Sequence, residues 1–279
     1  MSQQFLLIIA SIAIGFTYLL NKKITDVKYS AASYTALRSL TDSIVALPLL
    51  FIHPHFSVSP FYWFIVAISV SIYGLSVFCS FKAYQKIDAS VVSIIHKISV
   101  VISAILGIIF LRESYTILRY FGLFLIVGSG MILAYNKKRF SITTGMWFAL
   151  LMAATSGIAG YLDKIILNDF SPYTYAFINP FLIFLLFSRK RSTFGEIKSI
   201  FYKHPVQIVL TSIFAVSSWL IFLIVLQQTN VSQTLPMYKS LSYVTPVIFG
   251  ILLLGERSQL LQKILGVIIG IAGIFFLYR

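Results

Sequence analysis

A long apolar unit occurs twice in this chain, once from Asp88 and once from Val231. Each copy begins with an apolar stretch that carries a lysine near its middle. A short polar break that contains a glutamate follows, and a glycine-rich apolar stretch closes the unit. Aligning Glu113 with Glu256 keeps these features in register. A chain built this way is expected to fold into two similar halves.

The repeat reaches back to the N-terminus. Gly15 aligns with Gly157, and Asn21 aligns with Asp163. A lysine follows both Asn21 and Asp163. These correspondences predict two repeats, residues 1–136 and residues 141–279, separated by a short basic segment.

Composition assigns the chain to the membrane. Hydrophobic residues make up 58% of it and charged residues only 11%, whereas soluble globular proteins have roughly 25% charged residues. A membrane-spanning helix needs about 20 residues, so the sequence predicts an all-α integral membrane protein with ten transmembrane helices and no separate soluble domain. The net charge of +14 is typical of basic loops beside membrane spans, and we expect no nucleic-acid partner.

The apolar stretches place the ten expected spans at about residues 5–20, 31–52, 60–81, 88–111, 117–135, 144–166, 172–187, 205–226, 231–254 and 264–278. Only the connection that begins at Ser188 is long enough to hold a surface helix. The N-terminus lacks a basic leader and a small-residue cleavage site, so the first span is expected to stay in the protein. Cys79 is the single cysteine, which excludes an intramolecular disulfide.

Loop charges predict that the two repeats are inverted. A unit with five spans crosses the membrane an odd number of times, so its second copy enters from the opposite side. The connection after the second span has no Lys or Arg, whereas its counterpart after the seventh has five, from Arg189 to Lys203. The basic connections follow odd-numbered spans, which predicts that they face the cytoplasm and that both termini lie outside it, in the cell inner membrane.

The two copies resemble the repeat of the EamA-like family of the drug/metabolite transporter superfamily, whose units close with a span, a Gly-Glu turn and a glycine-studded span. Arg38 resembles the arginine of that family's second helix, and Pro246 stands where the family often has a helix-bending proline. The first copy departs from the pattern at Arg112 and Ser103, which predicts a straighter fourth span. The resemblance covers nearly the whole chain and implies a transporter with its substrate held between the halves.

Ionisable residues inside the expected spans are the main candidates for substrate binding. Each costs roughly 2.5–3.5 kcal/mol at a helix centre, so each is expected to face a cavity or a partner. Lys97 and Lys239 lie near mid-depth, and His96 is the register equivalent of Lys239. Arg38 and Asp42 are one helical turn apart and can pair with each other. Structural pairing is the alternative for all of these residues.

Further candidates lie on spans that the resemblance assigns to the cavity: Tyr161, Asn179, Trp219, Tyr238 and Tyr243. Packing is the alternative for each aromatic residue. Asp163 is expected to anchor a membrane edge beside Lys164. If its side chain instead turns inward, Asp163 and Asp42 are the candidates for proton coupling, because burial favours the protonated carboxyl group.

These features predict a secondary transporter and not an enzyme, since the sequence has no catalytic or nucleotide-binding motif, and no cofactor or metal is expected. The substrate is expected to be a small anionic or zwitterionic metabolite, because the buried cations outnumber the carboxylates free to pair with them. A flippase for lipid or lipid-linked sugar is the alternative. The GxxxG pattern at Gly266 and Gly270 is interpreted as packing within a monomer, with a dimer as the alternative.

Overall fold

The structure is a computed structural model, and it describes residues 3–111, 116–136, 139–140, 142–240, 242–255 and 259–277. This part of the chain is a bundle of helices, with one antiparallel pair of two-residue strands between the halves, β1 (Tyr135–Asn136) and β2 (Arg139–Phe140). The polar breaks that contain Glu113 and Glu256 lie outside the described residues.

The helices before the strand pair are α1 (Gln3–Ile24), α2 (Ala31–Ala46) with the short 3-10 helix η1 (Leu47–Phe51), α3 (Pro60–Tyr84), α4 (Ala89–His96), α5 (Ile98–Leu111) and α6 (Ile117–Ala134). Those after it are α7 (Thr144–Ile166), α8 (Pro172–Phe187), α9 (Arg191–Lys203), α10 (Pro205–Gln228), α11 (Val231–Ser240), α12 (Val244–Leu253) and α13 (Leu260–Leu277). The expected surface helix in the connection after Ser188 is therefore present as α9.

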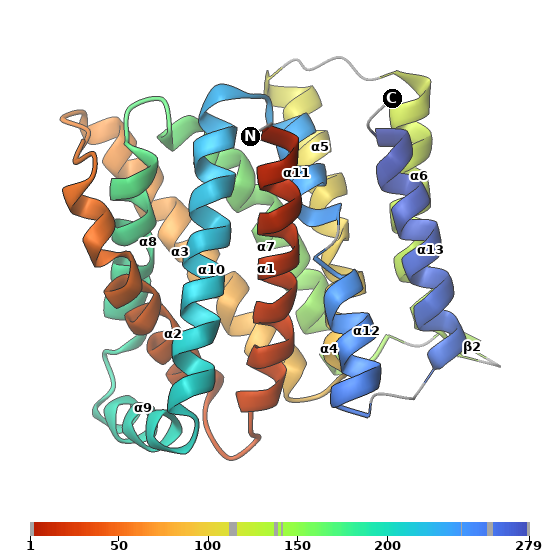
Figure 1. The fold of residues 1–279 in the computed structure, drawn as a ribbon, viewed down its shortest axis with the longest axis horizontal. Coiled ribbons are helices and arrows are strands. Elements are labelled where there is room, and N and C mark those ends of the chain that lie inside the picture. Colours follow the sequence, from red (N-terminus) through yellow and green to blue (C-terminus); the bar gives the residue numbers. More distant parts are fainter. Residues whose placement is uncertain are drawn as a thin grey trace.

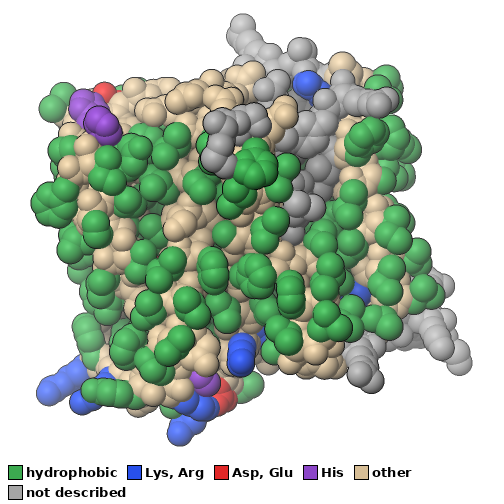
Figure 2. All heavy atoms as spheres, in the orientation of Figure 1, with side chains coloured by type: hydrophobic (Ala, Val, Ile, Leu, Met, Phe, Trp, Pro, Cys, Tyr) green, Lys and Arg blue, Asp and Glu red, His purple; other side chains and the backbone are tan. Residues whose placement is uncertain are grey.

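Among the described residues, five helical segments are long and apolar enough to cross a membrane. They are α1, α3, α7, α10 and the segment Ala89–Phe110, which comprises α4 and most of α5. Shorter apolar helices lie beside them, among them α8 and α12. Hydrophobic side chains cover the middle of the face in Figure 2, as expected for lipid contact. The chain is a multi-pass membrane protein.

The fourth span is interrupted at a single residue, and the segment Ala89–Phe110 still forms one apolar span through this interruption. α4 ends at His96 and α5 begins at Ile98. Between them the amide of Lys97 bonds to the carbonyl of Ile94, three residues back, which is a 3-10 turn. The ninth span breaks between α11 and α12. Pro246 follows this break in the first turn of α12, where a missing amide breaks no helical hydrogen bond.

Helices α1 and α7 occupy the centre of the bundle and run in opposite directions (Figure 1). Near the end of α1, the Lys22 ammonium donates to the carbonyl of Ile87 at 2.9 Å. At the start of α7, Gly145 also lies against Ile87. At the opposite end, Gln3 of α1 and Lys164 of α7 both bond to the end of α10.

Two glycines allow the central helices to approach the other half of the chain closely. A Cβ atom at Gly15 would lie 2.8 Å from the carbonyl oxygen of Ser242, and one at Gly157 would lie 2.8 Å from that of Ser99. No side chain fits at such a distance, so glycine is required at both positions. Each helix therefore packs on a segment of the opposite half.

Candidate functional site

A pocket of about 180 Å³ lies at the centre of the bundle. Its walls come from α1, α2, α3 and α4 of the first half and from α7, α8, α10 and α11 of the second. The charged, histidine and amide side chains that line it are Asn21, Arg38, Asp42, His96, Asn179 and Lys239. Drug-sized ligands occupy pockets of roughly 300–1,000 Å³, so this pocket suits a small metabolite.

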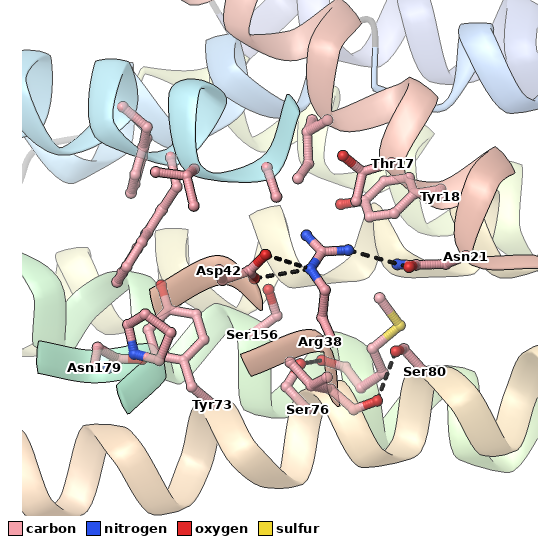
Figure 3. Close-up of a pocket in the computed structure, with 18 of the residues that line it drawn as sticks. Thr17, Tyr18, Asn21, Arg38, Asp42, Tyr73, Ser76, Ser80, Ser156 and Asn179 are labelled. Atoms are coloured by element: carbon pink, nitrogen blue, oxygen red, sulfur yellow. Dashed lines mark hydrogen bonds and ion pairs between the residues drawn. The ribbon is translucent and has the colours of Figure 1, made fainter. Parts of the chain in front are cut away.

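Arg38 and Asp42 form the predicted ion pair on α2. Nε of Arg38 donates to both carboxylate oxygens of Asp42 at 2.7 and 2.8 Å. Nη1 donates to the side-chain oxygen of Asn21 on α1 at 3.1 Å (Figure 3). Nη2 has no partner among the described residues. The guanidinium is thus oriented from two sides, and its Nη2 nitrogen remains available to a ligand.

Lys239 and His96 also line the pocket. Within the described residues Lys239 makes no ion pair, and its ammonium lies 5.3 Å from the centre of the Tyr238 ring. Nδ1 of His96 is 3.1 Å from the hydroxyl of Tyr18, while Nε2 is buried and has no hydrogen-bond partner among the residues that the structure describes. A buried polar atom without a partner is costly, so these two side chains retain hydrogen-bonding capacity that a ligand would use.

The side chain of Asp163 turns inward, which is the alternative to the expected role as an interfacial anchor. Its side chain is fully buried, and its carboxylate accepts hydrogen bonds from the hydroxyls of Tyr73 at 2.5 Å and Tyr175 at 2.8 Å. Lys164 turns the other way and donates to the carbonyl oxygens of Leu226 and Thr229. The sequence alone could not decide between the two positions, because the tyrosines that hold Asp163 are on other helices.

Lys97, Tyr161 and Tyr243 are not among the residues that line the pocket. Lys97 donates to the carbonyl oxygen of Gly266 on α13 at 3.1 Å, and its ammonium lies 3.7 Å from the centre of the Tyr243 ring. Carbonyl and aromatic partners stabilise a buried ammonium without a carboxylate. Tyr161 packs against Phe110.

Asn179, Trp219 and Tyr238 reach the pocket from three different helices. The amide of Asn179 donates to the hydroxyl of Tyr175 at 3.1 Å. Tyr238 accepts from the hydroxyl of Ser218, and Nε1 of Trp219 is buried without a hydrogen-bond partner in the described part of the chain. Of the predicted site residues, these three therefore join Arg38, Asp42, His96 and Lys239 around one cavity.

A stripe of polar residues on α3 was not identified from the sequence. Tyr73, Ser76 and Ser80 line the pocket, and Ser69 bonds to Tyr175 behind it. These positions recur at intervals of four, three and four residues, which places them on one helix face. That spacing within an uncharged span was the signal that could have revealed them.

Comparison with known proteins agrees with this architecture. The sequence model of the EamA-like transporter family matches residues 1–135 and 143–279. The chain belongs to the EamA-like transporter family. A search of curated proteins found no significant match. A crystal structure whose description names no activity shares the fold, with a TM-score of 0.62 and 12% identity over 98% of this chain and 95% of that one.

Family membership makes the protein a membrane-embedded transporter and suggests that it is not an enzyme. The matched ranges cover both halves, so the pocket lies between two parts that each match the family. Within the described residues, no group of three or more His, Cys, Asp or Glu side chains is placed to hold a metal ion.

Proposed function

We propose that this EamA-like transporter is a secondary transporter of a small zwitterionic or anionic metabolite, such as an amino acid, which binds in the central pocket. The observation that carries the proposal is a set of nitrogen atoms around this pocket that lack partners in the described part of the chain, two of them on cationic side chains. The ammonium of Lys239, Nη2 of Arg38 and Nε2 of His96 have no hydrogen-bond partner among the described residues.

The charges around the pocket favour a substrate with a negative group. Asp42 already compensates Arg38 at 2.7 Å, and within the described residues no carboxylate contacts Lys239. A carboxylate or phosphate on the substrate would supply the missing partner of this buried ammonium. Asp42 also lines the pocket and would accept a hydrogen bond from an ammonium group of a zwitterion.

Alternating access between two inverted repeats is supported by contacts that occur in pairs. Gly15 packs on Ser242, while Gly157 packs on Ser99, and these four positions are pairwise equivalent in the repeat. In the same way Lys22 bonds to carbonyls at and beyond the end of α3, and Lys164 bonds to those at and beyond the end of α10. Such equivalent contacts fit ten spans arranged as two halves that exchange conformations around a fixed site.

The orientation that we propose puts the basic end of the bundle in the cytoplasm. Most Lys and Arg side chains visible in Figure 2 gather at its lower edge, where α9 lies, whereas α1 begins and α13 ends at the upper edge in Figure 1. The positive-inside rule then places both termini outside the cytoplasm, in a cell inner membrane.

Transport of a lipid or lipid-linked sugar is the second candidate function. It would require an opening toward the bilayer with basic groups at headgroup level. The pocket is instead lined by helices from both halves, and its charged groups lie on the middle turns of α2 and at the inner ends of α4 and α11. This position favours a small soluble substrate.

Binding tests the proposal directly. Thermal-shift measurements on the purified protein against amino acids, sugar phosphates and other anionic metabolites should identify a stabilising compound. Lys239→Gln should then weaken its binding by about 1.5–3 kcal/mol, the range for hydrogen bonds to charged groups, which is roughly ten- to a hundredfold in Kd.

Lys97→Gln is the matched control, since both lysines are buried but only Lys239 lines the pocket. We expect the effect of Lys97→Gln to be much smaller. Equal affinity of the wild type and Lys239→Gln for anionic and neutral forms of one substrate would contradict the proposal.

A further inference from the structure

The two carboxylates Asp42 and Asp163, which lie inside the described spans, have different surroundings. Asp42 is held by the Arg38 guanidinium, whereas Asp163 accepts hydrogen bonds from two tyrosine hydroxyls, those of Tyr73 and Tyr175. No ion pair within the described residues includes Asp163, although its side chain has no exposed surface. Its negative charge is therefore offset in direct contact only by neutral donors.

Few charged or titratable groups face Asp163 from the helices packed around it. These are Tyr73 of α3, Tyr175 of α8, and Tyr238 and Lys239 of α11. α5 and α10 contain no titratable side chain, and α10 contributes the indole of Trp219. On α4, His96 bonds to Tyr18 instead, and on α7 itself Lys164 turns to the end of α10. Lys239 attracts the carboxylate without contacting it.

The hydrogen bonds of Tyr175 suit both protonation states of Asp163. With the carboxylate ionised, the Tyr175 hydroxyl donates to Oδ1 at 2.8 Å and accepts from the Asn179 amide at 3.1 Å. The Ser69 hydroxyl lies 2.8 Å from the hydroxyl oxygen of Tyr175. If a proton binds to Oδ1, the new O–H donates to Tyr175, and Tyr175 redirects its own O–H to Ser69.

This exchange needs no movement of heavy atoms and leaves the oxygens of Asp163 and Tyr175 hydrogen-bonded in both states. One proton enters from water and one O–H bond forms at Asp163, while Tyr175 keeps its own proton. A buried carboxyl group that is satisfied with and without its proton is suited to binding and releasing one.

The network extends from Asp163 to the pocket. Asn179 and Tyr73 both bond within the network and line the pocket. In the first repeat the equivalent of Asp163 is Asn21, a neutral amide that bonds to Arg38. The titratable group at this position is thus specific to the second repeat.

We propose that Asp163 is a proton-binding site, linked to the substrate pocket through Tyr73, Tyr175 and Asn179, and that the proton is the ion coupled to transport. This inference rests on the proposed transport function for its biological role. Proton binding itself is testable without any substrate.

Infrared difference spectroscopy of the purified protein in lipid nanodiscs measures the protonated carboxyl group directly. The chain has only 8 Asp and Glu residues, so the C=O band of a buried COOH group is resolvable while pH is varied. We expect a reversible band in the wild type that disappears in Asp163→Asn. It should persist in the double variant Arg38→Gln/Asp42→Asn, which removes the Asp42 carboxyl group together with its partner.

Two milder variants test the assignment if Asp163→Asn does not fold. Tyr73→Phe removes a donor to the ionised form, so the midpoint of the band should shift to more alkaline pH. Ser69→Ala removes the acceptor that Tyr175 uses in the protonated form, so the midpoint should shift to more acidic pH. Opposite shifts of one band would identify Asp163 by its two partners.

Absence of a titrating band in the wild type, a band that survives Asp163→Asn, or midpoints unmoved by both Tyr73→Phe and Ser69→Ala would overturn the proton site. None of these outcomes affects the substrate-binding test of Lys239→Gln. Conversely, a normal band in a protein that binds no metabolite would contradict the proposed transport function and leave the proton site intact.

Discussion

Individual buried charges in this protein are stabilised in different ways. The guanidinium of Arg38 uses a carboxylate and an amide, whereas the ammonium of Lys97 uses a carbonyl oxygen and an aromatic ring. Lys263 of α13 is completely buried and pairs with Asp88 at 2.8 Å. A charge in low dielectric needs such partners, so removal of one partner costs more than removal of both.

The Arg38–Asp42 pair tests this rule. Asp42→Asn leaves the buried Arg38 cation with only Asn21 as a partner, and we expect a loss of roughly 3 kcal/mol in the free energy of unfolding. The double variant Arg38→Gln/Asp42→Asn should be more stable than Asp42→Asn alone. Thermal unfolding and the folded yield of the purified variants measure which of the two is more stable. A double variant that is less stable than the single one would show that the two residues act separately.

At the scale of elements, α9 is attached to the start of α2, the helix that carries Arg38. The carboxylate of Glu196 accepts from the amide of Ser30, the residue that caps α2, at 2.9 Å. Lys203 at the end of α9 pairs with Asp26 in the preceding loop at 3.2 Å. The surface helix thereby holds the entry to a helix of the pocket.

The two carboxylates make this attachment sensitive to pH. The hydrogen bond from the Ser30 amide lowers the pKa of Glu196, and that from the Lys28 amide, with Lys203, lowers the pKa of Asp26. Because folding lowers these pKa values, the contribution to stability is present above the ordinary values of about 4. It is lost as pH falls through the lowered values.

A spin label on the exposed Ser199 of α9, in a Cys79→Ser background, should report this change. We expect the label to be less mobile at neutral pH and more mobile in acid. In Asp26→Asn/Glu196→Gln its mobility should be higher at neutral pH and independent of pH. An identical acid response in this double variant would mean that other groups hold α9.

At the scale of the whole molecule, the loop charges and the fold make one prediction about orientation. Lys190 is exposed at the basic end, beside α9, and Val58 is exposed in the loop between η1 and α3. If the basic end faces the cytoplasm, a cysteine at position 58 should react with an impermeant reagent added to intact cells, and one at position 190 should not.

Each cysteine is introduced into a protein in which the buried Cys79 has been replaced. Ser57 would be a poor choice for this experiment, because only 4% of its surface is exposed and its hydroxyl bonds to Asp169. The reverse labelling pattern would place both termini in the cytoplasm and contradict the orientation drawn from loop charges.

The amino-acid sequence alone was sufficient to identify the membrane class, the repeat and the family. Long apolar stretches leave helices as the main way to satisfy the backbone in lipid, and turn residues mark the ends of these helices. The ion pair of Arg38 and Asp42 was also predictable, since residues four apart on a helix are neighbours whatever surrounds them.

The tertiary structure decided which buried groups face the pocket. His96 and Lys97 are adjacent in sequence, yet only His96 lines the cavity, because the chain turns between α4 and α5 and Lys97 reaches α13. From the sequence, Asp163 was expected to anchor a membrane edge. In the structure its carboxylate is bonded to tyrosines from α3 and α8. Contacts between distant segments depend on how helices pack, and periodicity within one helix carries no information about its partners.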